Sequence, residues 1–459
     1  MPDIFPVLHQ ATIPPNIAPL NFMLNDSCNS IEIELQTSEI FLVESFIGNK
    51  VKFSQKQWRE ILNQSSGDTL SITVYAIIDE VKHKYDPIHL YVAPEPIDDF
   101  LVYRLIMPGF QTWNEMGIYQ RKLSTFDEKP ILNSKVMPGT CMNCHSFAGK
   151  ESEHMMLHLR ENFGGTVIKT GDALKKVHTK TEQTFASAGF PYWHPSGKYI
   201  AFSINSVRQI FHAKGHVRAH ALDMKSDMAI YNVEENDFFT SPVISSDESF
   251  EAFPCFSPDG ETLYFVTAPA GELPRDQTEM KYSLVAVSFD PHTGRTGSRV
   301  DTLISARETG QSVSIPRVSP NGKLLLITQF DYGNFPAYNP EADLYLYNLE
   351  TDDYYALDKV NSNDVESYHT WSSNSRWIVF SSRRRDGLYM DAWIAYIDEH
   401  GKGHTPFMLP QKDPEFLKHF MFSYNIPELV KSEVNLNPYD IAAVARKTEG
   451  EQAGYSISH

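Results

Sequence analysis

Apolar and polar residues alternate in short stretches near the start of the chain. Residues 31–35 and 70–74 each carry an apolar side chain at every second position, which is typical of strands with one solvent-facing side. Between them, residues 54–63 predict a short helix capped by Ser54. We therefore expect a small β-sandwich-like domain over 21–100, after an irregular, proline-rich lead at 1–20.

From about residue 190, a turn followed by an apolar run recurs along the chain. The best copy is Ser257-Pro258-Asp259-Gly260, and equivalents begin the runs at 193–203, 318–328 and 371–381. Proline fixes φ at the second turn position, and Asp-Gly or Asn-Gly supplies the positive φ that reverses the chain. The weakest copy, at 372–375, lacks both proline and glycine.

A second apolar element follows each turn, over 227–233, 283–289, 343–349 and 391–397. Two elements repeated in phase indicate the blades of a β-propeller. The turn and its flanking strands resemble the blade signature of the TolB-like propeller family. That resemblance implies an all-β protein with a six-bladed (TolB-like) β-propeller.

Six blades need more strands than the four clear copies supply. Residues 100–106 and 117–121 predict strands of a degenerate early blade, and 164–168 predicts the second strand of the next blade. We therefore expect the propeller to span 101–430. Within it, residues 141–160 are expected to be an insertion, and 431–459 a C-terminal extension.

Charge and composition exclude several classes of partner. The formal net charge of −18 repels nucleic acid phosphates and anionic lipid surfaces. No run of about 18 apolar residues is present, so we expect no transmembrane helix in this chain. The four cysteines are too few and too scattered for a disulfide scaffold.

Two of these cysteines belong to a motif that carries chemistry. Cys141, Cys144 and His145 form Cys-x-x-Cys-His, in which the thiols bond to the haem vinyl groups and the histidine is the proximal iron ligand. A chance match has an expectation on the order of 10⁻³. Eight of the 17 histidines lie between His145 and His220, which also favours a metal centre. The motif therefore predicts covalently bound haem c.

Other interpretations of the two cysteines stay open. A zinc site would need two further ligands, which His154 and His158 are able to supply. A redox Cys-x-x-Cys pair usually lies at a helix N-terminus beside a βαβ unit, and nothing around the motif has that pattern. An inert match is the third alternative.

The sixth iron ligand must come from elsewhere in the fold. His158 is the first candidate for the distal ligand, and Met155 or Met156 are alternatives. Arg160 is a candidate partner for a haem propionate. An open sixth position would instead permit catalysis, so the sequence leaves open whether the protein is an enzyme.

Three further histidines, His212, His216 and His220, have helical spacing. Gly215 and the surrounding strand pattern argue against a helix. We expect these histidines in a loop near the mouth of the ring, with a second metal site as the alternative.

Three stretches together, 12–22, 141–147 and 192–197, resemble one group of proteins. It consists of TolB-like, cytochrome-c-motif proteins of the bacterial cell envelope, often described as cytochrome c biogenesis or translocation proteins. The resemblance implies the periplasm or cell envelope as the location. Residues 1–5 carry neither a charged nor an apolar leader, so we expect the signal or lipoprotein peptide to be absent from this chain.

Three functions follow as expectations. The first is an exported c-type haem protein that transfers electrons or holds a redox centre, with a redox partner in an envelope complex. The second is a haem-free propeller that acts as a protein-interaction module. The third is a haem enzyme with an open iron site.

Overall fold

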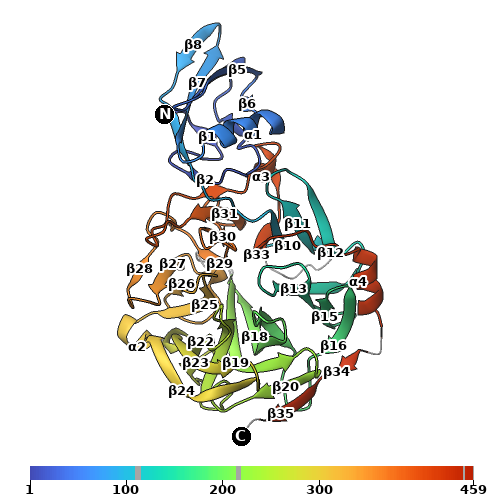
Figure 1. Ribbon diagram of the computed structural model, residues 1–459. Coiled ribbons are helices and arrows are strands. Elements are labelled where there is room, and N and C mark those ends of the chain that lie inside the picture. The colour runs from blue at the N-terminus through green and yellow to red at the C-terminus, as the bar shows by residue number, and fades with distance from the viewer. Residues whose placement is uncertain (109–114, 213–218, 448–449, 458–459) are drawn as a thin grey trace.

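Six of the eight sheets form a closed ring in the computed structural model, which describes residues 1–108, 115–212, 219–447 and 450–457. Figure 1 shows the six sheets around a central axis, with a separate β domain attached at one side. The predicted fold class, an all-β six-bladed β-propeller after a small N-terminal β domain, is confirmed.

Blade 1 joins the two ends of the propeller. Its strands are, from the axis outward, β33 (Ser423–Val430), β10 (Phe100–Ile106), β11 (Gly117–Lys122) and β12 (Glu128–Asn133). The late strand β33 pairs antiparallel with the early strand β10. This pairing joins the last part of the chain to the first blade and so closes the ring.

The other blades are sequential four-stranded antiparallel sheets whose first strand lies innermost. Their strands are β13 (Thr140–Phe147), β14 (His154–Glu161), β15 (Gly165–Thr170) and β16 (Ala173–His178) in blade 2; β17 (Ala188–Trp193), β18 (Tyr199–Phe211), β19 (Ala219–Asn232) and β20 (Asp237–Thr240) in blade 3; β21 (Ser249–Phe256), β22 (Thr262–Pro269), β23 (Ser283–Asp290) and β24 (Arg295–Ile304) in blade 4; β25 (Ser312–Val318), β26 (Leu324–Phe330), β27 (Asp343–Asn348) and β28 (Tyr354–Ala356) in blade 5; and β29 (Glu366–Trp371), β30 (Trp377–Ser382), β31 (Asp391–Tyr396) and β32 (Phe407–Met408) in blade 6.

The segment expected to be an insertion is part of blade 2. Residues 141–160 form most of β13 and β14, the two innermost strands of that blade. Residues 164–168 fall at the third strand, β15, rather than the second. The apolar residues of the motif segment pack between blades, which is why the segment folds as strands and not as a loop.

The repeated turn has the same hydrogen bonds in three blades. In blade 4, the Ser257 hydroxyl accepts the N–H of Thr262 at 3.0 Å, and Asp259 accepts the N–H of Glu261 at 3.0 Å. Ser319 and Ser372 make the equivalent bonds in blades 5 and 6. These bonds hold the tight reversal from each innermost strand into the second strand.

The N-terminal domain contains two sheets and one longer helix. The larger sheet consists of β2 (Thr12–Ile13), β9 (Ile88–Val92), β7 (Thr69–Ile78), β4 (Ser30–Gln36) and β5 (Phe41–Ile47), with β8 (Val81–Lys84) paired to β7; the smaller consists of β1 (Ile4–Phe5), β3 (Phe22–Leu24) and β6 (Lys50–Val51). Helix α1 (Gln55–Gln64) is capped by the Ser54 hydroxyl, as predicted.

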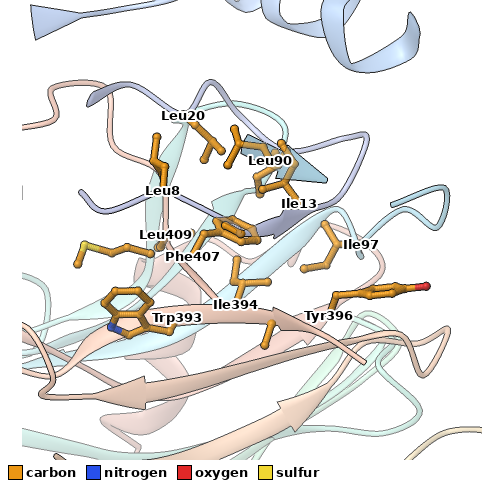
Figure 2. Close-up of a cluster of buried hydrophobic side chains, with 14 of the residues drawn as sticks. Leu8, Ile13, Leu20, Leu90, Ile97, Trp393, Ile394, Tyr396, Phe407 and Leu409 are labelled. Atoms are coloured by element: carbon orange, nitrogen blue, oxygen red, sulfur yellow. The ribbon is translucent and has the colours of Figure 1, made fainter. Parts of the chain in front are cut away.

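The proline-rich lead joins the N-terminal domain to blade 6. Leu8, Ile13 and Leu20 are buried in a single hydrophobic cluster with Ile394 and Phe407 of the outer strands β31 and β32 (Figure 2). Burying this apolar surface stabilises the contact between the domains. The lead is therefore a packed part of the structure.

The C-terminal segment returns to the ring. Strand β34 (Glu451–Gln452) adds parallel to β16, and β35 (Gly454–Ile457) adds parallel to β20. The remaining helices are α2 (Ala306–Thr309), η2 (Gln277–Glu279), η3 (Pro336–Tyr338), α3 (Phe416–His419) and α4 (Pro438–Ala445). Within the described ranges, none of the helices is long and apolar enough to cross a membrane.

Candidate functional site

The Cys-x-x-Cys-His motif lies on β13, the innermost strand of blade 2. Cys144 pairs in register with His158 of β14, and His145 pairs with Leu157. Successive side chains of a strand point to opposite faces. The Cys144 thiol and the His145 imidazole therefore lie on opposite faces of the blade.

His145 is buried against blade 1. Its neighbour in register, Leu157, belongs to a cluster with Val102 and Ile118 of blade 1. Burial, together with the nearby Arg104, lowers the pKa of His145 to about 3, so the ring is neutral. Neither ring nitrogen has a hydrogen-bond partner among the described residues.

The predicted distal ligands lie on β14. His158 is buried, its Nδ1 lies 3.0 Å from the Thr166 hydroxyl, and burial lowers its pKa to about 3. His158 lies on the Cys144 side of the blade, opposite to His145. Met156 packs on the blade 3 side and Met155 on the blade 1 side. Arg160 is exposed and pairs in register with Cys141.

These positions do not fit a covalently bound haem. Haem c needs both thiols at one porphyrin edge and the histidine beneath the same ring, whereas β13 places Cys144 and His145 on opposite faces. His145 and His158 also lie on opposite sides of blade 2, so they are not arranged as two axial ligands. Covalent haem stays a prediction of the sequence.

The zinc alternative is not favoured by the geometry either. In the part of the chain that the structure describes, no group of three or more histidine, cysteine, aspartate or glutamate side chains is placed to hold a metal ion. His154 instead packs edge-on against Trp193, with ring centroids 6.1 Å apart.

The innermost strands of all six blades line a central cavity of about 280 Å³. Each of these strands carries a bulge, where its register with the next strand shifts. Five bulges contain a residue with positive φ, between 44° and 54°. Bulges change the direction in which side chains point. At the height of the bulges, the cavity is lined by Cys144, Phe190, Phe253, Ile315, Tyr368 and Ile426.

Aromatic rings close one end of the cavity. The rings of Phe190 and Phe253 are 4.8 Å apart, and Phe335 lies 5.5 and 5.6 Å from them. Phe335 also lines a second cavity of about 20 Å³, together with His220 and Asp223. The phenyl cluster therefore separates the two cavities, and the larger one opens at the other end of the ring.

Charged groups occupy the wall above this aromatic floor. Arg317 comes from blade 5, Glu428 from blade 1, and Lys150 from the turn after β13. Burial lowers the pKa of Lys150 and raises the pKa of Glu428. The guanidinium of Arg317 lies 5.1 Å from the centre of the Tyr192 ring. An apolar floor below convergent polar groups is typical of a binding site.

None of these wall residues was predicted from the sequence, although the sequence contains a signal for them. An apolar residue followed by proline occurs in four innermost strands, at Phe190-Pro191, Phe253-Pro254, Ile315-Pro316 and Ile426-Pro427, and in the first three it precedes the repeated turn. The residue after each proline is Tyr192, Cys255, Arg317 or Glu428. Proline cannot donate to a ladder and is confined to edges and bulges, so this dipeptide marks the bulge.

The expectation of loop histidines near the mouth of the ring is wrong for His220, which lies in strand β19 and lines the small cavity at the closed end. His212 Nε2 and His220 Nδ1 are 2.9 Å apart, and His220 Nε2 lies 3.5 Å from the Tyr332 hydroxyl of blade 5. His216 falls outside the described residues. His212 follows the last residue of β18 and His220 lies in β19, and these two paired strands reach toward the centre of the ring in Figure 1.

Comparisons with known proteins give similarities of fold only. No protein-family model and no curated protein matches the chain. The structure is similar to TolB from Acinetobacter baumannii, with a TM-score of 0.45 and 11% identity over 79% of each chain. It is also similar to prolyl oligopeptidase B from Galerina marginata (TM-score 0.38, 11% identity, 74% of this chain and 42% of that chain). A puromycin-hydrolysing peptidase of Mycobacterium tuberculosis matches with a TM-score of 0.38 and 12% identity, over 75% of this chain and 52% of that chain.

Proposed function

We propose that the protein is a protein-interaction module whose central cavity receives an extended segment of a partner. The observation that carries this proposal is the cavity of about 280 Å³, lined by all six innermost strands and closed at one end by phenyl rings. A closed floor admits the end or one side chain of a segment, and the rest would lie across the mouth.

The mouth of the cavity suits a chain that lies across it. It is lined by residues of the repeated turns, including Pro195, Pro258, Pro320 and Ser373. The hydrogen bonds described above hold the turns of blades 4, 5 and 6 rigid. A preformed site loses little conformational entropy when a ligand binds.

The proposal is tested with a pool of random octapeptides passed over the immobilised chain. Retained peptides are identified by mass spectrometry. The variant Ser146→Tyr places a large ring in the cavity, and blade 3 already carries Tyr192 at the corresponding position, so the strand accepts this side chain. Ser45→Tyr, on the exposed strand β5, is the matched control.

We expect the wild type and Ser45→Tyr to retain the same peptides, and Ser146→Tyr to lose them. Retention that is unchanged in Ser146→Tyr would place the binding surface elsewhere. If none of the three proteins retains any peptide, the proposal is rejected.

A second candidate function rests on the motif at Cys141, Cys144 and His145. In it the chain is an exported haem protein of the periplasm or cell envelope, either an electron carrier or an enzyme with an open iron site. Because the folded arrangement does not fit haem, attachment would require β13 to adopt another conformation. The chain is expressed behind a periplasmic signal with haem-maturation factors.

A pyridine haemochrome spectrum and a haem-stained denaturing gel then decide this candidate. Haem retained on the gel with a c-type spectrum would establish covalent attachment. Apo-protein with free thiols at Cys141 and Cys144 would leave the interaction module as the working function.

A further inference from the structure

We infer that the central cavity recognises a carboxylate of the bound segment, either its C-terminus or an Asp or Glu side chain, through Arg317 and Lys150. The inference rests on the proposed function and names the chemistry that the site selects. Two of the basic side chains that face the cavity have no carboxylate partner among the described residues.

Arg317 has unused hydrogen-bonding capacity. One Nη1 hydrogen bond, of 2.8 Å, goes to the main-chain oxygen of Pro316. Among the described residues, no carboxylate lies within ion-pair distance of its guanidinium, whose position is set by the Tyr192 ring. The planar guanidinium matches a carboxylate with two parallel hydrogen bonds. Arg317 is therefore placed to bind an anion that the chain itself does not supply.

Lys150 spans the mouth of the cavity. Its Nζ donates to the Thr370 hydroxyl of blade 6 at 2.5 Å, and no described carboxylate forms an ion pair with it. Burial lowers the pKa of Lys150, because the ammonium has lost part of its hydration. A bound carboxylate would replace that lost solvation with a charge-assisted hydrogen bond.

Other titratable groups near the cavity leave this cationic character in place. Asp98 already accepts hydrogen bonds from the N–H and the hydroxyl of Ser373, at 2.8 and 2.5 Å. Lys431 is paired with Glu151 at 2.8 Å. Burial lowers the pKa of His369 to about 3, so it is neutral. Among the residues that line the cavity, the charged groups outside an ion pair are thus Arg317, Lys150 and Glu428, while Asp98 acts on Lys150 from outside the lining.

Glu428 also limits which anion fits. Its carboxyl group comes from blade 1 and faces the same space as both cations. With Glu428 ionised, Arg317, Lys150 and Glu428 together leave a net charge of +1, which a singly charged carboxylate would neutralise. A doubly charged group would leave an excess negative charge in a partly buried site. The whole chain carries a net charge of −18, so this local attraction is specific to the cavity.

Four matched octapeptide pools test the inference on the full chain. One pool has a free C-terminal acid and no Asp or Glu, one has a C-terminal amide with Asp and Glu, one has both acids, and one has neither. We expect the pool with both acids, and at least one of the two single-acid pools, to bind about tenfold or more tightly than the neutral pool. Whichever single-acid pool binds identifies the source of the carboxylate.

Variants separate this recognition from loss of folding. Arg317→Gln combined with Lys150→Met is expected to remove the preference for acids, and Arg317→Lys to keep part of it. Arg299→Gln, at an 87% exposed side chain, is the control. Thermal unfolding curves check that each variant is folded.

The two proposals fail in different ways. If the neutral pool binds as well as the acidic pools, or the double variant keeps the preference, carboxylate recognition is wrong while the interaction module stands. If no pool binds the wild type, both proposals are wrong.

Discussion

His145 and His369 occupy corresponding positions in blades 2 and 6, and each buries its imidazole against the preceding blade. His369 Nε2 lies 3.2 Å from the Leu326 oxygen and its Nδ1 3.3 Å from the Thr328 hydroxyl, both in blade 5. His145 faces the main chain of Val102 and Ile426 of blade 1, but neither of its ring nitrogens is in hydrogen-bonding geometry with a described residue. The histidine of the haem motif therefore has a counterpart with a purely structural role in a blade without cysteines.

This correspondence predicts different costs for removing the two rings at neutral pH. His369→Leu should destabilise the fold by about 1–3 kcal/mol, because it loses buried hydrogen bonds. His145→Leu should cost less, because its ring nitrogens have no partner among the described residues. Urea unfolding at pH 7 measures both. A larger loss for His145→Leu would show that its ring has an essential partner.

Acid should reverse part of this effect. Burial lowers the pKa of both histidines from 6.5 to about 3, so the unfolded chain binds more protons between these values and stability falls as pH drops below 6.5. Each leucine variant removes one such group. When the pH is lowered from 7 to 5, the free energy of unfolding of each variant should therefore rise relative to the wild type by about 2 kcal/mol. A difference that does not change with pH would contradict the buried neutral state.

Asp223 predicts the opposite pH dependence. Burial raises its pKa from 3.8 to about 7, although Asn205 and Asn334 donate to its Oδ2 at 2.6 and 2.7 Å. The folded state therefore binds more protons, and this contribution is lost as pH rises from about 4 to 7. As pH rises across that range, the free energy of unfolding of Asp223→Asn should increase relative to the wild type by roughly 1.4 kcal/mol per pH unit.

Unfolding of both proteins at pH 4.5, 6 and 8 checks this prediction. The exposed Asp172→Asn is the control and should follow the wild type at every pH. A constant gap between Asp223→Asn and the wild type would mean that Asp223 is ionised throughout.

Restoring the repeat at the weakest turn should destabilise the protein. Ser373 stands where blades 4 and 5 have Pro258 and Pro320, and its N–H donates to Asp98 of the interdomain linker at 2.8 Å. Proline has no N–H. Ser373→Pro should therefore cost about 1–3 kcal/mol, measured by urea unfolding. Ser373→Ala keeps the N–H and should cost less; equal losses would show that only the hydroxyl matters.

The basic run at 383–385 is neutralised within blade 6. Arg384 donates to the fully buried Glu366 at 2.7 Å, while Arg383 and Arg385 pair with Asp364 and Asp391. Arg384→Met leaves a buried carboxylate without its partner and should cost about 3–5 kcal/mol. Adding Glu366→Gln should recover part of that loss, and the exposed Arg299→Met should change stability by less than about 1 kcal/mol. A double variant no better than Arg384→Met would show that the pair is not coupled.

Local patterns in the sequence were sufficient for four of the six blades, whereas the count of six followed from the resemblance to TolB-like propellers. The turn at 257–260 and the apolar run after it define a hairpin, because each turn residue has a local conformational role. Repetition of that unit indicates a ring of blades. The cap at Ser54 was predictable for the same reason, since its hydroxyl bonds to the N–H of Gln57 only three residues away.

The site depended on tertiary structure. A one-residue bulge in β13 decides which face each motif side chain takes, and period-two alternation cannot place a bulge in advance. The cavity wall brings together Lys150, Arg317 and Glu428 from three blades far apart in the chain. Only ring closure by β33 sets their proximity, so the sequence by itself determined the blades, and the closed ring decided which charges face one another.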